Sequence, residues 1–392
     1  MDGDDLLNPF EGFVWSIGEE GSDPVVTRDG VDFRHDQFAQ SGHDVHQDED
    51  LGSISDLGVE LVRYGTPWRL AEPEPGTYDW QHWDQAFAAC DAAELEPIVE
   101  FLHFGLPDHY SGFLDPAWVD GFCRYVDAFI ARYPGHRFFT PINEPGVTAR
   151  FSARLGFWND RRSSKEDHAV ALANVVLANL EALARLRSDR DAWWIGAEGF
   201  DMPIALNDDD QTRAARRRAV HWLVWDLHFG TEVPADVAEY LDPVSDAVRS
   251  RIAELTITDK LVAGLDAYPV SIDPIGDEVP DWTVQDRIDI VMAEIRRWHE
   301  RYGQPFWIAE TSNLSLPVSD QVPWLHAMAA GLSGLAADGL PARGLCWYSR
   351  GDQFDWQTAL TNPVGAVTEV GLFDVDRQPR PVAQAFRNLA TS

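Results

Sequence analysis

The chain has 392 residues, of which 45% are hydrophobic, so it carries enough apolar material for one large barrel or for two ordinary domains. Its 65 acidic residues against 31 basic residues give a formal net charge of -34, and the acids are scattered along the chain. This charge repels phosphate groups, which argues against binding to nucleic acid or to an anionic membrane surface.

Short apolar runs alternate along the chain with longer amphipathic stretches. The apolar runs cover residues 12–17, 59–64, 96–101, 137–142, 193–197, 261–267, 306–309 and 344–348. The amphipathic stretches include residues 80–93, 116–133, 166–187, 284–302 and 321–338. Strands that alternate with helices predict a parallel sheet, and eight such units predict a single α/β domain, a (β/α)8 TIM barrel over residues 1–392. A doubly wound sheet is the main alternative, but no run is followed by a G-x-G-x-x-G turn.

Two glutamates follow apolar runs. Glu144 ends the segment 138–144 (FFTPINE), and Glu310 ends the segment 306–310 (FWIAE). Active sites of TIM barrels lie at the carboxyl ends of the strands, so we expect both carboxyl groups in one pocket. Glycoside hydrolysis needs such a pair, one group to protonate the leaving oxygen and one to attack the sugar carbon or activate a water. The alternatives are a helix cap for Glu144 and a structural carboxylate paired with an arginine for Glu310.

These motifs resemble those of glycoside hydrolase family 1, a family of retaining β-glycosidases with a TIM-barrel fold, over residues 10–389. Segment 140–145 (TPINEP) is similar to the family's T-F-N-E-P, and segment 308–313 (IAETSN) is similar in part to I-T-E-N-G. The resemblance implies that Glu144 is the general acid/base, that Asn143 contacts the sugar 2-hydroxyl and that Glu310 is the nucleophile.

Three further segments carry the resemblance. Segment 62–68 (VRYGTPW) is similar to Y-R-F-S-I-S-W, which implies that Arg63 lies beside the nucleophile and keeps it ionised. Segment 266–268 (DAY) is similar to N-Y-Y, which implies a hydrogen bond from Tyr268 to the nucleophile, although an aspartate replaces the asparagine. Segment 100–107 (EFLHFGLP) is similar to T-L-Y-H-W-D-L-P, which implies that His103 binds the sugar 3-hydroxyl.

Two more segments bear on the distal side of the sugar site. Segment 347–356 (WYSRGDQFDW) is similar to W-S-L-x-D-N-F-E-W, which implies Tyr348 and Trp356 as aromatic contacts and Asp355 as the group that holds the 4- and 6-hydroxyls. Core packing is the alternative for the aromatic residues. The first run lacks the glutamine of the family's Q-x-E-G, and we expect Glu20 or Glu19 in its place. These departures predict a divergent member whose sugar need not be glucose or galactose.

The resulting hypothesis is a retaining glycosidase that acts on small glycosides or oligosaccharides. We expect carboxyl groups about 5–5.5 Å apart, a raised pKa for Glu144, and neither a metal nor an organic cofactor. The alternatives are a carbohydrate-binding pseudoenzyme, a transglycosylase that uses the same residues, and a sugar-nucleotide pathway protein.

Several weaker signals accompany these motifs. Segment 43–50, with two histidines and four acids, suggests either a metal site or, as we favour, a solvated loop and helix start. Glu198 and Asp201 follow the fifth run and could line the pocket. Trp158 and Asn159 could form a wall on the leaving-group side.

The remaining features concern the protein's surroundings. The odd count of three cysteines, without metal-type spacing, disfavours a disulfide framework and a zinc knuckle. Residues 1–5 (MDGDD) do not resemble a signal peptide, and we expect no apolar run long enough to span a bilayer. The sequence therefore predicts a cytoplasmic protein and leaves a homo-oligomer open. Dispersed acids with only two lysines, Lys165 and Lys260, predict adaptation to high salt, where screening weakens self-repulsion.

Overall fold

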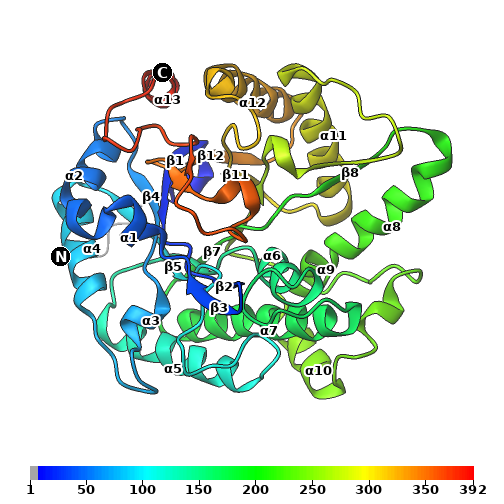
Figure 1. Cartoon of the computed structure of the whole chain (residues 1–392), viewed down its shortest axis with the longest axis horizontal. Coiled ribbons are helices and arrows are strands. Elements are labelled where there is room, and N and C mark those ends of the chain that lie inside the picture. The colour runs from blue at the N-terminus through cyan, green and yellow to red at the C-terminus, as the bar shows by residue number, and fades with distance from the viewer. Residues whose placement is uncertain (1–7) are drawn as a thin grey trace.

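The computed structural model describes residues 8–392, and these form a closed barrel of eight parallel strands at the centre of the molecule (Figure 1). Residues 1–5, discussed above as unlike a signal peptide, lie outside the described residues. The barrel strands are β1 (Val14–Glu20), β4 (Leu61–Gly65), β5 (Glu96–Leu102), β6 (Phe138–Ile142), β7 (Trp193–Ile195), β9 (Leu261–Asp266), β11 (Phe306–Glu310) and β12 (Ala342–Tyr348). β12 pairs with β1 and closes the barrel. The predicted TIM barrel is confirmed, and each predicted apolar run overlaps one of these strands.

The barrel interior is apolar at one end and polar at the other. Leu61, Ile98 and Val262, on three different strands, belong to one buried apolar cluster. Inward-facing positions recur every two residues along a strand, so the same faces of β4 and β5 next carry Arg63 and Glu100. The polar side chains are therefore gathered toward the carboxyl ends of the strands, where TIM-barrel active sites lie.

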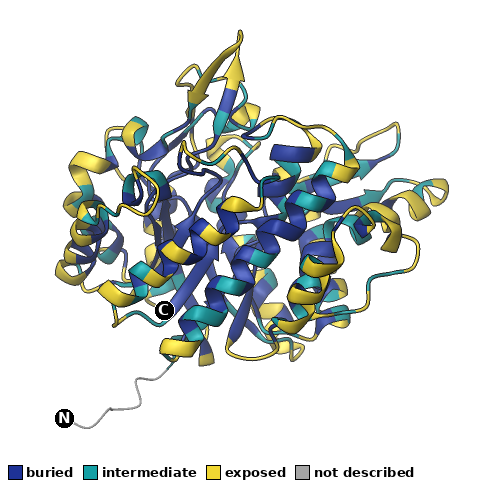
Figure 2. Cartoon of the chain, turned by 90° about the horizontal axis from the view of Figure 1, so that it is seen from below, coloured by how far each residue is buried: buried dark blue, intermediate teal, exposed yellow. Residues whose placement is uncertain are grey.

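Helices surround the barrel, and most of them turn a buried stripe toward the strands (Figure 2). α5 (Ala117–Arg132), for example, buries Trp118, Phe122, Tyr125 and Phe129, whose spacing places them on one helix face. The other helices are α1 (Gln37–Ser41), α2 (His43–Ser55), α3 (Trp68–Ala71), α4 (Gln81–Ala92), α6 (Pro145–Ala149), α7 (Lys165–Asp189), α8 (Gln211–His221), α9 (Leu223–Phe229), α10 (Asp246–Glu254), α11 (Val284–Tyr302), α12 (Gln321–Ala337) and α13 (Pro381–Ala390). The five predicted amphipathic stretches coincide with α4, α5, α7, α11 and α12.

α7 is long and apolar enough to cross a bilayer by length and composition alone, so the expectation that no apolar run reaches this length is wrong. In the structure, however, 72% of its apolar window is buried inside the protein. The helix packs against α5, α6 and α10. Helices in the core of soluble proteins pass the same length test, and the burial of α7 is that of a core helix.

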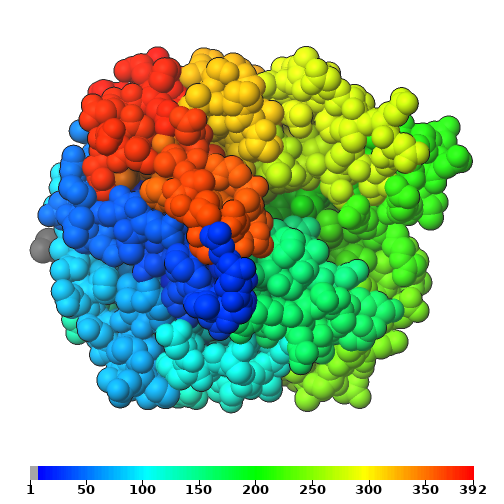
Figure 3. Space-filling model, viewed as in Figure 1, coloured from blue at the N-terminus to red at the C-terminus, as the bar shows by residue number. Residues whose placement is uncertain are grey.

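The segments that follow the barrel strands form the face on which the site lies. After β1 comes a hairpin of β2 (Val25–Arg28) and β3 (Val31–Arg34), and after β12 a second antiparallel pair, β13 (Gln353–Phe354) and β14 (Val367–Thr368). β8 (Met202–Ala205) pairs in parallel with β10 (Ile272–Ile275) and leads toward α8. Figure 3 shows this face hollowed at its centre, between the C-terminal segment after β12 and the middle of the chain.

Candidate active site

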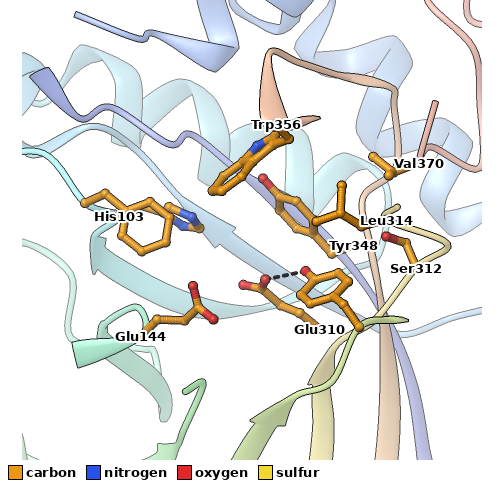
Figure 4. A pocket seen from close by; sticks show the side chains of 10 residues that line it. His103, Glu144, Glu310, Ser312, Leu314, Tyr348, Trp356 and Val370 are labelled. Atoms are coloured by element: carbon orange, nitrogen blue, oxygen red, sulfur yellow. Dashed lines mark hydrogen bonds between the residues drawn. The ribbon is translucent and has the colours of Figure 1, made fainter. Parts of the chain in front are cut away.

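A pocket at the carboxyl ends of the barrel strands opens into a wider cleft of about 940 Å³. Glu144 and Glu310 face each other across the pocket (Figure 4). His103, Tyr348 and Trp356 also turn their rings toward it. The structure thus brings together five residues that the sequence assigned to one site from four separate segments.

Glu310, the last residue of β11, accepts hydrogen bonds at both carboxyl oxygens. Nη1 of Arg63 donates to Oε1 at 2.6 Å. The hydroxyl of Tyr268 donates to Oε2 at 2.6 Å, which is the contact drawn in Figure 4. Glu310 pairs with an arginine, as expected if its role were only structural, but it also lines the pocket opposite Glu144. The charge of Arg63 therefore stabilises a carboxylate that still faces the pocket.

Arg63 is fully buried and connects Glu310 to Asn143 directly and to His103 through Glu100. Its Nη2 donates to Oε2 of Glu100 at 2.6 Å and also to Oδ1 of Asn143. Nδ1 of His103 lies 2.7 Å from Oε1 of Glu100, and its Nε2 lies 3.1 Å from Nδ2 of Asn143. These partners assign the Nδ1–H tautomer to His103, with Nε2 as an acceptor. Asn143 itself is fully buried and is not among the residues that line the pocket, so its predicted contact with the sugar 2-hydroxyl stays a prediction.

Glu100 is a site residue to which the sequence analysis assigned no role. It is fully buried on β5, between Arg63 and His103. Burial alone would raise the pKa of Glu100, but Arg63 and His103 lower it below its usual value. A glutamate inside an apolar strand was the available signal, because a buried carboxylate requires a cationic partner.

Glu144 lies at the turn between β6 and α6, with a backbone φ of 41° that residues other than glycine rarely adopt. Within residues 8–392 its side chain makes no capping hydrogen bond to α6, so a helix cap does not account for it. Burial raises the pKa of Glu144 well above its usual value, and repulsion from Glu310 and Glu198 adds to this effect. Such a raised pKa is what a general acid needs.

A third carboxyl group, that of Asp266 at the end of β9, lies beside these two glutamates. One oxygen from each of Glu144, Asp266 and Glu310 lies within 4.8 Å of the other two. In the described part of the chain neither oxygen of Asp266 has a hydrogen-bond partner. Burial raises the pKa of Asp266 well above its usual value, as do the charges of Glu310 and Glu144. The three groups could offer oxygen ligands to a hard cation, but Arg63 already places a positive charge beside Glu310, and the raised pKa values favour the neutral forms of Glu144 and Asp266.

The sequence profile of Glycosyl hydrolase family 1 matches residues 28–268, which is more than half of the chain. This chain belongs to glycosyl hydrolase family 1. It is therefore a glycoside hydrolase. The matched region contains Arg63, His103, Asn143, Glu144 and Tyr268, and it ends before Glu310.

The family 1 chain is similar to several described proteins at low sequence identity. A putative beta-glucosidase 17 from Oryza sativa subsp. japonica is 22% identical over 240 residues, covering 55% of this chain and 78% of that protein. A probable inactive beta-glucosidase 14 from the same plant is 20% identical, covering 88% and 80%. The crystal structure of a GH1 beta-glucosidase from Exiguobacterium antarcticum superposes with a TM-score of 0.81 at 17% identity, covering 98% of both chains. A family 1 beta-glucosidase from Thermotoga maritima gives 0.78 at 16% identity, covering 97% and 98%. These structures support the barrel fold.

In this family 1 enzyme the segment after β12 carries two residues predicted to contact sugar, Trp356 and Asp355, and only Trp356 lines the pocket. Trp356 lines the pocket and the cleft, and its indole Nε1 has no partner among the described residues. Asp355 does not line either: its carboxyl oxygens accept from the backbone N–H groups of Val364, Gly365 and Ala366, at 2.8 to 3.2 Å. The expected contact of Asp355 with the 4- and 6-hydroxyls is therefore corrected to the positioning of its own loop.

Glu20, expected in the place of the missing glutamine, lies beside Arg63 and not in the pocket lining. Its carboxyl group lies 3.4 Å from Nη1 of Arg63 and 2.6–2.7 Å from where a Cβ on Gly18 would stand. Neither oxygen has a hydrogen-bond partner in the structure of residues 8–392, and burial raises its pKa well above its usual value. Glu20 does not line the pocket, so it lies behind Arg63 and not against a ligand. Glu19 instead accepts from Arg350 at 2.7 Å.

The weaker signals have structural explanations. Of the favoured solvated loop and helix start over residues 43–50, the helix start is confirmed, because α2 begins at His43, and most of the segment is exposed. The loop is wrong, because the whole segment is helical, and His43 and Asp50 are buried and bonded to each other at 2.9 Å. Trp158 is fully buried and donates to a backbone carbonyl, and the side chain of Asn159 holds two backbone segments, so neither forms a wall of the cleft.

Glu198 and Asp201 lie close to Glu144 without lining the pocket itself. Both line a small cavity next to it, and Asp201 also lines the cleft. Glu198 accepts from the backbone N–H of Gly146 at 2.8 Å, and burial raises its pKa to about 8. Asp201 pairs with Arg150 at 2.6 Å. Their charges add to the raised pKa of Glu144.

Proposed function

We propose that this family 1 enzyme is a retaining β-glycosidase in which Glu310 is the nucleophile and Glu144 is the general acid/base. The observation that carries the proposal is the close approach of these two residues, with one carboxyl oxygen of each within 4.8 Å of the other. Retaining glycosidases hold their carboxyl groups about 5–5.5 Å apart, whereas inverting enzymes separate them by about 6.5–9.5 Å to admit a water. The spacing favours direct attack by Glu310.

In the first step a carboxylate oxygen of Glu310 attacks the anomeric carbon. The bond from that carbon to the leaving oxygen breaks, and Glu144 gives its proton to the leaving oxygen. The product is a glycosyl ester on Glu310. Burial and the neighbouring acids keep the proton on Glu144 before this step, and Arg63 and Tyr268 hold Glu310 in place for the attack.

In the second step Glu144, now a carboxylate, takes a proton from a water molecule. The water oxygen attacks the anomeric carbon, the ester bond breaks, and Glu310 regains its carboxylate. Two inversions at one carbon give overall retention. A sugar hydroxyl in place of the water would give transglycosylation with the same residues.

The neighbouring groups fit the binding of a sugar ring. The ring of His103, to which Asn143 is hydrogen-bonded, lines one side of the pocket, and Tyr348 and Trp356 supply aromatic faces. Aromatic faces and a few polar groups are typical of sugar sites. Several similar proteins carry the name beta-glucosidase, which makes β-glucosides the first substrates to try. The position of Asp355 leaves other sugars open.

The test is a panel of 4-nitrophenyl β-glycosides assayed in high salt with wild type and Glu310→Ala, with and without azide. We expect turnover by wild type and a loss of at least about 10⁴-fold in the variant. Azide should restore nitrophenol release and give a glycosyl azide of inverted configuration. A product of inverted configuration from wild type would refute the retaining mechanism.

The second candidate is a carbohydrate-binding protein without activity, as the printed name of one rice relative suggests for that protein. Binding of a sugar by folded wild type, measured by calorimetry and without turnover of any glycoside, would favour this candidate.

A further inference from the structure

In the lining of the cleft next to the pocket, basic side chains outnumber acidic ones, the reverse of the whole protein. Among residues 8–392, five arginines and three acidic side chains line it, whereas acidic residues outnumber basic ones by 65 to 31 in the chain. The arginines are Arg150, Arg154, Arg213, Arg216 and Arg217. One of the three acids is Glu144, which is favoured in its neutral form. An electropositive cleft in so acidic a protein is a local arrangement and does not follow from overall composition.

Two elements supply these arginines. α8 has the sequence QTRAARRRAVH, with no acidic residue, and the spacing of Arg213, Arg216 and Arg217 places them on one helix face. α8 extends from the rim toward the open centre of the barrel face (Figure 1). Arg150 and Arg154 come from the π-helical turn Arg150–Arg154, directly after α6. The cleft is therefore lined by cations from two sides.

The arginines of α8 are weakly held by the protein. Arg213 pairs with Asp210 at 3.2 Å, and Arg217 pairs with Asp273 at 3.0 Å, but their side chains are 66% and 52% exposed. Exposed pairs of this kind contribute little to stability, so both guanidinium groups can turn to a ligand at small cost. Arg150 keeps an Nε without a hydrogen-bond partner in the described structure.

The cleft lies on the leaving-group side of the proposed reaction. It shares Glu144, Tyr268 and Trp356 with the pocket, and Glu310 is not part of its lining. Glu144 is the group that protonates the leaving oxygen in the proposed mechanism, so a leaving group extends past Glu144 into this cleft. We propose that the cleft binds a leaving group that carries an anion, a carboxylate, sulfate or phosphate on a sugar or aryl ring. Arginine forks match the oxygens of all three.

The test uses disaccharides with one glycone, the best of the nitrophenyl panel, β-linked to glucose, glucuronate, glucose 6-sulfate or glucose 6-phosphate. Wild type should cleave at least one anionic disaccharide with kcat/KM about tenfold or more above that of the neutral one. The double variant Arg213→Gln/Arg217→Gln should bring this ratio to within about threefold of one. The control, Arg296→Gln, removes an arginine of similar exposure that pairs with Asp338 away from the cleft, and it should keep the wild-type ratio. The anionic disaccharide that is cleaved fastest shows whether the cleft prefers a carboxylate, a sulfate or a phosphate.

A binding measurement separates this inference from the proposed function on which it rests. Calorimetry at the same salt concentration should show glucuronate, glucose 6-sulfate or glucose 6-phosphate binding to wild type more tightly than glucose, and losing that advantage in the double variant. This result without turnover of any glycoside would refute the glycosidase proposal and leave the anion site standing. Turnover of neutral glycosides with no anionic preference, and no anion binding that depends on Arg213 and Arg217, would overturn the anion site alone.

Discussion

At the scale of single residues, the site depends on one buried arginine among several carboxyl groups. Burial alone lowers the pKa of Arg63, but the charges of Glu20, Glu100 and Glu310 raise it well above its usual value. Glu100 and Glu310 each accept a hydrogen bond from one guanidinium nitrogen of Arg63 at 2.6 Å. Burial raises the pKa of Glu20 well above its usual value, which favours its neutral form beside this arginine.

Replacement of Arg63 should therefore affect stability as well as activity. Arg63→Met leaves the carboxylates uncompensated, and we expect the free energy of unfolding to fall by about 3–5 kcal/mol, measured by urea denaturation in high salt. Arg63→Lys keeps the charge but cannot reach Glu310, Glu100 and Asn143 together, so it should unfold at a higher urea concentration than the methionine variant yet lose most of kcat. Unchanged stability in both variants would contradict the charge balance.

The raised pKa of Glu144 should appear in the pH profile. A general acid works while it holds its proton, so kcat/KM should fall as the pH rises through the pKa of Glu144. This fall should occur well above the usual pKa of a glutamate. Glu144→Gln should lose this alkaline limb and slow the cleavage of poor leaving groups by about 10²–10⁴-fold. It should affect a 2,4-dinitrophenyl glycoside much less, because that leaving group needs no proton. An alkaline limb that persists in the variant would assign it to another group.

At the scale of elements, the ends of neighbouring strands position Glu144. The backbone N–H of Glu144 donates to the carbonyl of Ala197, beyond β7, at 3.0 Å. The same segment passes so close that a Cβ on Gly199 would lie 3.1 Å from Oε1 of Glu144 and 2.4 Å from Val147. The strained turn of Glu144 and the glycine opposite it therefore fit together as one arrangement.

Gly199→Ala should show this dependence. The added methyl group should displace Glu144 or Val147, with a loss of about 1–3 kcal/mol of stability and at least about tenfold in kcat. Gly334→Ala is a matched control, because Gly334 is exposed in α12 and, apart from its chain neighbours and its own helix backbone, none of the described atoms lies within 4 Å of its added Cβ. That change should stabilise the protein by about 0.5–1 kcal/mol and leave kcat unchanged. Equal kinetics in both variants would refute the contact with Glu144.

At the scale of the whole molecule, the charge of -34 opposes folding by self-repulsion. Ion pairs spread over the surface offset part of this repulsion, for example Arg132 with Asp84 and Arg296 with Asp338. Exposed pairs are individually weak, so we expect screening by dissolved salt to reduce much of the remaining repulsion.

We therefore expect the melting temperature to rise by about 5 °C or more between 0.1 M and 2 M potassium chloride. Sucrose at the same osmolality is the control, because it favours compact states without screening charge. A melting temperature that is independent of salt, or that rises equally in sucrose, would show that the acidic surface is not an adaptation to high salt.

The sequence alone predicted the barrel and the two glutamates that the structure brings together in one pocket. Apolar periodicity is local, so eight runs and the helical stretches between them could be read without tertiary contacts. The position of Glu144 and Glu310 after two such runs placed both at the same end of the barrel. Arg63, Tyr268 and His103 followed from the resemblance; the structure brings Tyr268 and His103 to the pocket and Arg63 into contact with Glu310.

Only the tertiary structure decided how these groups are partnered. Arg63 meets Glu310 across 247 residues of sequence, and Asp355 turns to backbone N–H groups of its own loop instead of the pocket. The role of Glu100 and the gathering of arginines along the cleft also needed the fold. The physical reason is that side-chain direction, hydrogen bonding and burial depend on neighbours brought together by barrel closure, which no local pattern records.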